Sequence, residues 1–147
     1  GYLNEIIFSF KETSKKEFIL NIDQDSNSKK ITKSIEIIYG LRNFIGNANK
    51  YSKKKIYISL KSDNEFSEII IEDDGEGYPN DIISKIGEPY LKTVRQKNKA
   101  MSGLGLGIFI GKTLLEKNFA SINCRNSETR RGAEVRIKWK NKDLFKI

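Results

Sequence analysis

Apolar positions along the chain follow two spacings, which predict alternating helices and strands. Between Ile31 and Tyr51 they recur every three or four residues, the period of a helix. Five short stretches rich in Ile, Val or Phe predict strands: 17–22, 55–60, 68–73, 121–126 and 133–139. Three further stretches predict helices. Residues 2–10 predict either a short helix or the edge of one, and residues 81–86 predict a short helix. Residues 103–118 predict a helix that begins near Leu106.

Residues 87–102 interrupt this alternation with a polar, basic and aperiodic stretch. A loop of this length inside a compact domain is usually either functional or disordered. There is no internal repeat, low-complexity segment or interdomain linker, and 147 residues suit one domain of ordinary size. We therefore predict a single domain over residues 1–147.

Composition narrows the class of protein. The chain is 37% hydrophobic, which suffices for a folded core, and no apolar run approaches the roughly 20 residues of a membrane helix. Residues 1–10 lack the features of a signal peptide, so we expect a soluble, cytoplasmic domain. Cys124 is the only cysteine, which excludes an internal disulfide; we interpret it as a buried strand residue and not as a redox switch.

Charge and the absence of one residue type exclude several activities. The net charge is +8, but the basic residues are scattered, so we expect no nucleic-acid binding and consider a nucleotide or an acidic partner instead. The chain has no His, which excludes histidine-based acid–base catalysis, a Ser-His-Asp triad and His-ligated metals. A metal here would need oxygen ligands, and this favours Mg²⁺.

The helix that ends near Tyr51 places Glu36, Asn43, Asn47 and Lys50 within one narrow stripe. Asn supplies a neutral oxygen for a hard cation, and Lys is a point charge for phosphate. The alternative is a solvated face in a protein rich in Asn.

Two glycine-containing stretches add to this pattern. In "DDGEGYP" (73–79), Asp73 ends a buried strand, and Gly75 and Gly77 would let the backbone approach a flat base; the alternative is a plain Asp-Gly turn. In "GLGLG" (103–107), alternating glycines precede a helix whose N-terminus would favour phosphate; the alternative is a flexible hinge.

Together, in this order, these stretches resemble the ATP-binding catalytic domain of sensor histidine kinases, in the superfamily that also contains gyrase, Hsp90 and MutL. The matching boxes are "NFIGNANKYS" (43–52), "DDGEG" (73–77), "GEPYLKT" (87–93, with Tyr90 where Phe is usual), "GLGLG" (103–107) and "RRGAEVRI" (130–137). The chain is also similar to the RegB/PrrB redox-responsive histidine kinases. The resemblance implies a Bergerat fold: an α/β two-layer sandwich with a mixed, mostly antiparallel sheet, about three helices and a mobile ATP lid over residues 87–102.

The resemblance also implies roles for individual residues. Asn47 would be the Mg²⁺ ligand, Asp73 would bind the adenine amino group, and Asn43 and Lys50 would be catalytic. The implied nucleotide-binding set is Asn43, Asn47, Lys50, Tyr51, Asp73, Gly75, Gly77, Tyr78, Lys92, Thr93, Arg95, Gly103, Leu104, Gly105, Leu106 and Gly107.

Asn43 separates two activities within the superfamily. The ATPases place a Glu there to activate water, and an Asn cannot accept that proton, so the resemblance implies phosphoryl transfer and not hydrolysis. The γ-phosphate of ATP–Mg would pass to a His of a separate dimerisation domain, and then to a response regulator. With no His of its own, the fragment should not autophosphorylate alone. It should also be mainly monomeric, because the resemblance implies that dimerisation belongs to the helices of the separate domain. The full-length protein would be a homodimer anchored in the inner membrane. The alternatives are an anti-sigma-type serine kinase of the same fold and a non-catalytic ATP-binding module.

Overall fold

The computed structural model describes residues 3–13, 16–22, 35–83 and 105–144. The elements in chain order are α1 (Leu3–Thr13), β1 (Glu17–Ile22), α2 (Ile35–Tyr51), β2 (Lys55–Ser62), β3 (Phe66–Asp73), α3 (Asn80–Ile83), α5 (Leu106–Lys117), β4 (Ser121–Asn126), β5 (Ala133–Lys140) and α6 (Asn141–Leu144).

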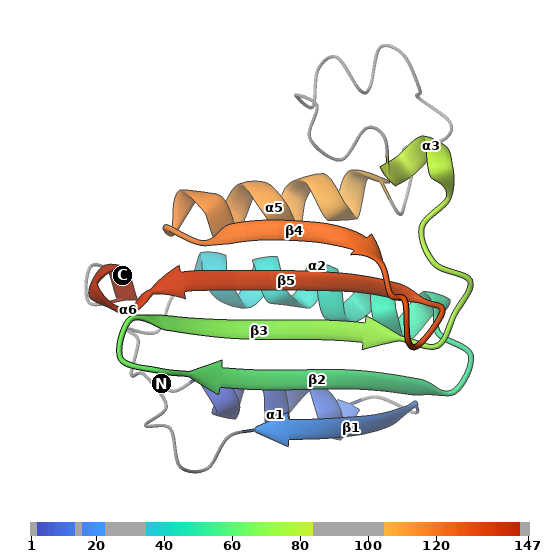
Figure 1. Ribbon diagram of the computed structural model, residues 1–147, viewed down its shortest axis with the longest axis horizontal. Helices are drawn as coiled ribbons and strands as arrows, with labels where there is room; N and C mark the ends of the chain where they lie inside the picture. The colour runs from blue at the N-terminus through green and yellow to red at the C-terminus, as the bar shows by residue number, and fades with distance from the viewer. Residues whose placement is uncertain (1–2, 14–15, 23–34, 84–104, 145–147) are drawn as a thin grey trace.

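The five strands form one sheet in the order β1-β2-β3-β5-β4, which can be followed across Figure 1. The pairing of β1 with β2 is parallel, and the other three pairings are antiparallel. A mixed, mostly antiparallel sheet is confirmed. All five predicted strands are present, and their observed bounds differ from the predicted ones by at most two residues at either end.

Alternation along the strands gives the sheet one apolar face. On β2 the buried residues are Ile56, Ile58 and Leu60, and the residues between them are more exposed. Ile69 and Ile71 continue that face on β3. Because successive strand side chains point to opposite sides, this apolar face needs a covering layer.

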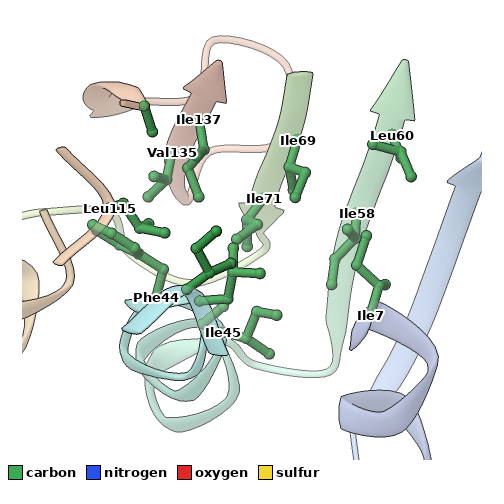
Figure 2. Close-up of a cluster of buried hydrophobic side chains, with 14 of the residues drawn as sticks. Ile7, Phe44, Ile45, Ile58, Leu60, Ile69, Ile71, Leu115, Val135 and Ile137 are labelled. Atoms are coloured by element: carbon green, nitrogen blue, oxygen red, sulfur yellow. The ribbon is translucent and has the colours of Figure 1, made fainter. Parts of the chain in front are cut away.

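Helices supply that layer. In Figure 1, α1 and α2 lie behind the sheet, and α5 contacts both α2 and β4. Figure 2 shows side chains of the helices, among them Ile7, Phe44 and Leu115, meeting those of β2, β3 and β5 in one cluster. The predicted two-layer α/β sandwich is therefore confirmed.

The helix predictions were less complete than the strand predictions. Among the described residues, α1, α2 and α5 are the longer helices, whereas α3 and α6 have four residues each. The short helix α6 (Asn141–Leu144) was not predicted. The predicted lid, residues 87–102, lies outside the described residues.

Glycines let α2 and α5 approach closely. A Cβ on Gly111 would lie 2.8 Å from Phe44 Cε2, and one on Gly40 would lie 2.6 Å from Leu115 Cγ. Side chains larger than hydrogen would therefore separate the two helices. Their contact holds the start of α5 beside Asn43 and Asn47 of α2.

In the part of the chain that the structure describes, every helix is too short or too polar to cross a bilayer.

Candidate functional site

A pocket of about 320 Å³ opens where the last turns of α2 meet the end of β3. Its walls are mainly apolar, with a few polar side chains among them. The lining residues are Phe44, Asn47, Ala48, Tyr51, Lys53, Ile71, Asp73, Glu76, Gly77, Tyr78, Pro79, Ala133 and Val135. A mainly apolar cavity with few polar groups is typical of small-molecule sites.

Asp73, the last residue of β3, supplies the buried carboxylate of this pocket, with 4% of its surface exposed. Its Oδ1 accepts hydrogen bonds from the backbone N–H groups of Gly75 (2.8 Å) and Ala133 (3.3 Å). Its Oδ2 accepts none from the described residues. Burial raises the pKa of Asp73, and these hydrogen bonds oppose that rise only in part. One oxygen is therefore held by the protein, and the other is open to a ligand.

The neighbouring carboxylate, Asp74, has a different role. Its oxygens accept hydrogen bonds from the backbone N–H groups of Lys53 (2.8 Å), Lys54 (3.1 Å) and Lys55 (3.2 Å). Burial alone would raise the pKa of Asp74, but these bonds outweigh it and lower the pKa. Asp74 thus fixes the turn between α2 and β2, and Asp73 remains available for binding.

The two glycines of the 73–79 stretch are both required by geometry. Gly75 is buried against the backbone of Tyr51, where an added Cβ would collide with the Tyr51 carbonyl group. Gly77 has φ +84°, a left-handed conformation that residues with a Cβ rarely adopt. Tyr78, which follows, is 6% exposed and also lines the pocket.

The α2 residues of the predicted site reach the pocket to different degrees. Asn47 and Tyr51 line it. Asn43 lies one turn earlier, where its Nδ2 donates to the Tyr39 carbonyl at 2.9 Å. Lys50 is exposed and outside the lining, with its ammonium group 5.3 Å from the centre of the Tyr51 ring. The structure therefore groups Asn47 and Tyr51 with Asp73 and places Asn43 and Lys50 at the margin.

Asn47 has an unusual polar environment. Its Nδ2 is buried and has no hydrogen-bond partner among the described residues. A Cβ built on Gly107 would lie 3.5 Å from both terminal atoms of this amide. A buried polar atom without a partner costs folding free energy, so a ligand that satisfies it would offset that cost.

The start of α5 faces the same region. Gly105 is buried, and Leu106 and Gly107 form the first turn, which has neither an acidic residue nor a side-chain cap at Gly105. The first N–H groups of a helix need partners, and an anion can supply them. The remaining predicted residues lie outside the described residues: Lys92, Thr93, Arg95, Gly103 and Leu104.

Sequence reasoning missed several lining residues: Phe44, Ala48, Lys53, Ile71, Glu76, Pro79, Ala133 and Val135. Phe44 and Ile71 have the apolar spacing of ordinary core residues. Lys53 directly follows the 43–52 box and Glu76 lies within the 73–77 box, and those positions were the only signal for them.

Cys124 is half-buried on β4 and packs against the core. Burial raises the pKa of its thiol to about 12. A thiol that stays protonated is a poor nucleophile, which agrees with the structural interpretation of this residue.

Comparison with known proteins identifies the family. Residues 32–143 match the family described as histidine kinase-, DNA gyrase B- and HSP90-like ATPases. This match covers most of the chain, and the chain belongs to that family.

Relatives narrow the class to sensor histidine kinases. The chain is 37% identical over 108 residues to the sensor histidine kinase RegB of Cereibacter sphaeroides, in an alignment covering 70% of this chain and 23% of RegB. It is 34% identical over 98 residues to the sensor histidine kinase CssS of Bacillus subtilis, covering 66% of this chain and 20% of CssS. The predicted resemblance to RegB-type kinases is thus confirmed. The chain spans less than a quarter of the length of these relatives.

Solved structures agree on the fold. The catalytic domain of the histidine kinase ThkA superposes with a TM-score of 0.72 at 20% identity, covering 95% of each chain. Full-length ShkA, in complex with AMPPNP, gives a TM-score of 0.62 at 21% identity and covers 92% of this chain and 27% of ShkA. The chain has the architecture of a histidine kinase catalytic ATPase domain.

Proposed function

We propose that residues 1–147 form one catalytic domain that binds ATP with Mg²⁺ and donates the γ-phosphate to a histidine on a separate dimerisation domain. The observation that carries this proposal is the carboxylate of Asp73. It is buried, it lines a mainly apolar pocket, and one of its oxygens accepts no hydrogen bond from the described residues. An exocyclic amino group of a base is a suitable donor for that oxygen.

The pocket suits an adenine ring on several grounds. Phe44, Ile71 and Val135 supply apolar surface, and Gly77 lets the backbone come close to a flat ligand. Asp73 then acts as the hydrogen-bond acceptor at the inner end. A buried carboxylate that would otherwise remain unpaired discriminates strongly in favour of a base with a donor at that position.

The phosphates would extend from the pocket toward the start of α5. The N–H groups of its first turn would bind phosphate oxygens, and Lys50 would add a positive charge from α2. Gly105, Leu106 and Gly107 leave this helix end without an acidic side chain that would repel phosphate.

The environment of Asn47 fits Mg²⁺. Its buried amide is unsatisfied at one atom, and rotating the amide by 180° would present oxygen in place of nitrogen at that position. Neutral oxygen is a ligand that Mg²⁺ accepts. When bound there, Mg²⁺ would neutralise charge on the phosphates, and Asn47 would hold it.

Transfer is favoured over hydrolysis because Asn43 stands at the position where the ATPases of this superfamily carry a Glu that activates water. Asn43 cannot accept a proton from water, and its amide is engaged with Tyr39. Glu36, two turns earlier, forms an ion pair with Lys117 at 2.9 Å and is therefore occupied elsewhere. Phosphoryl transfer depends mainly on positioning and charge neutralisation, which this arrangement supplies.

The histidine that accepts the phosphate must lie outside these 147 residues, because they contain no His. RegB and CssS are sensor kinases, and ShkA was solved with AMPPNP. As the sequence resemblance implies, we propose that the complete protein is a membrane-anchored homodimer that phosphorylates its own histidine and then a response regulator. The lid residues Lys92, Thr93 and Arg95, with Gly103 and Leu104, would complete the phosphate site.

The test is calorimetric titration of the 147-residue chain with AMPPNP, with and without Mg²⁺, followed by incubation with ATP and a separately supplied His-containing domain. We expect saturable binding that tightens with Mg²⁺, phosphate transfer to the supplied histidine, and no phosphorylation of the chain alone. Binding without transfer to any such domain would favour a non-catalytic module. No binding at millimolar nucleotide would overturn the proposal.

A further inference from the structure

Asn126 lies outside the pocket lining, yet it holds one of the pocket walls. It is the last residue of β4, and its side-chain amide forms two hydrogen bonds with the backbone of Tyr78. The Tyr78 N–H donates to Asn126 Oδ1 at 2.6 Å, and Asn126 Nδ2 donates to the Tyr78 carbonyl at 3.3 Å. A side chain here supplies the donor and acceptor that a neighbouring strand would normally supply.

The segment that Asn126 holds needs such support. The pairing between β3 and β5 ends at Glu72 and Glu134, so residues 76–79 continue beyond the sheet. Figure 1 shows that the segment from β3 to α3 passes the end of β4. A Cβ on Gly77 would lie 2.7 Å from Asn126 Oδ1, so the amide also packs directly against the segment.

The turn between β4 and β5, which follows Asn126, is also bonded to the end of β3. Beyond Asn126, Ser127 Oγ donates to Glu72 Oε2 at 2.7 Å and accepts from the Arg130 N–H at 3.1 Å. At the other end of the turn, the Ala133 N–H donates to Asp73 Oδ1. The connection between β4 and β5 is thereby attached to the last two residues of β3, Glu72 and Asp73.

We propose that Asn126 is a positioning residue for recognition of the nucleobase. It sets the separation between Asp73 and the wall formed by Gly77 and Tyr78, and that separation determines which bases can place a donor against Asp73. This inference rests on the proposed nucleotide-binding function and deepens it.

The role is confined to the base-binding end of the site. Asn126 contacts the 76–79 wall, whereas Asn47 and the first turn of α5 lie on other elements. Loss of the amide should therefore weaken selection among bases and leave the contribution of Mg²⁺ unchanged. A general loss of stability would lower the fraction of folded molecules. In the molecules that stay folded, it would change neither the ratio of affinities for two bases nor the ratio of affinities with and without Mg²⁺.

The experiment compares the affinities of the wild-type chain and Asn126→Ala for AMPPNP and GMPPNP, each with and without Mg²⁺. Two lost hydrogen bonds predict AMPPNP binding about tenfold weaker, with the preference for AMPPNP over GMPPNP reduced by a similar factor. The factor by which Mg²⁺ tightens binding should stay the same. Asn123→Ala, a change on the same strand at an exposed position, is the matched control and should alter neither ratio.

A second variant covers the case in which Asn126→Ala does not fold. Asn126→Asp keeps an acceptor for the Tyr78 N–H and loses the donor, so its base preference should fall between those of the wild type and Asn126→Ala. An unchanged base preference in the folded variants, with wild-type binding intact, overturns the role of Asn126 alone. If the wild-type chain binds neither nucleotide, the proposed function fails, and this role fails with it.

Discussion

The two ends of β3 both bury polar side chains, but only one of them leaves hydrogen-bonding capacity unused. At the Phe66 end, Ser67 donates to Asn141 Oδ1 (2.7 Å) and shares a hydrogen bond with Ser62 (2.6 Å), and Asn141 Nδ2 donates to the Asp63 carbonyl (2.7 Å). At the other end, Asp73 has one oxygen and Asn47 one buried nitrogen that form no hydrogen bond with any of the described residues.

The difference separates polar groups that hold the fold together from polar groups available to a ligand. Satisfied groups at the Phe66 end stabilise α6 against the hairpin of β2 and β3. Unsatisfied groups at the Asp73 end cost stability until something binds. Three substitutions and a change of pH test this contrast between the two ends of β3.

The largest effect is expected for Asp73→Asn. The amide oxygen can keep the bonds from Gly75 and Ala133, but the amide nitrogen would meet the donor of adenine. We expect ATP affinity to fall about 100-fold, or roughly 2.7 kcal/mol, as measured by calorimetry. Asp63→Asn, at the opposite end of the same hairpin, is the control and should leave affinity unchanged. Equal losses in the two variants would remove the distinction between the ends.

Asn141→Ala should lower the stability of the fold and leave nucleotide binding unchanged. It removes two hydrogen bonds and leaves Ser67 and the Asp63 carbonyl short of a partner. We expect a loss of about 2 kcal/mol in the free energy of unfolding, seen as a Tm lower by roughly 4–8 °C, with ATP affinity unchanged. Asn64→Ala, at a nearby exposed position, should alter neither quantity. Weaker ATP binding in Asn141→Ala would show that the two ends are coupled.

Gly111→Ala should lower both the stability of the fold and the affinity for nucleotide, and so break the contrast between the two ends of β3. Its Cβ would press on Phe44, which is both a core residue and part of the pocket lining. Overpacking should cost roughly 1–2 kcal/mol of stability and also weaken nucleotide binding. Gly46→Ala on α2, where an added Cβ meets nothing within 4 Å, should be neutral or slightly stabilising. Thermal unfolding and calorimetry on both variants give the comparison.

The smallest effect is a pH dependence of stability. Burial raises the pKa of Asp73 above its ordinary value of 3.8, so ionising it disfavours the folded state as the pH rises through that raised pKa. Asp73→Asn should therefore have a higher Tm than the wild type at neutral pH. The gap should close as the pH falls below 3.8, because Asp73 is then protonated in both states. A gap that does not vary with pH would contradict this assignment.

The sequence predicted the fold, and it singled out several residues that line the pocket, for physical reasons. Strands and long helices leave strong periodic patterns, so β1 to β5, α2 and α5 were recognised, whereas the four-residue helix α6 leaves almost none. Asp73, Asn47 and Gly77 were recognised because each lies in a short motif. Asn126 and Lys53 act through contacts between segments distant in sequence, and no local pattern predicts such contacts.

The order of strands has a consequence for how this domain folds. β3 and β5 are neighbours in the sheet, but residues 74–132 separate them along the chain. The hairpins β2–β3 and β4–β5 can form locally, whereas joining them must close this long connection. The entropy of closure grows only with the logarithm of loop length, about 0.6 kcal/mol for each doubling. Insertions that fall outside α3, α5, β4 and the pocket-lining residues 76–79 should therefore change the folding free energy little, so the length of this connection can vary at small cost.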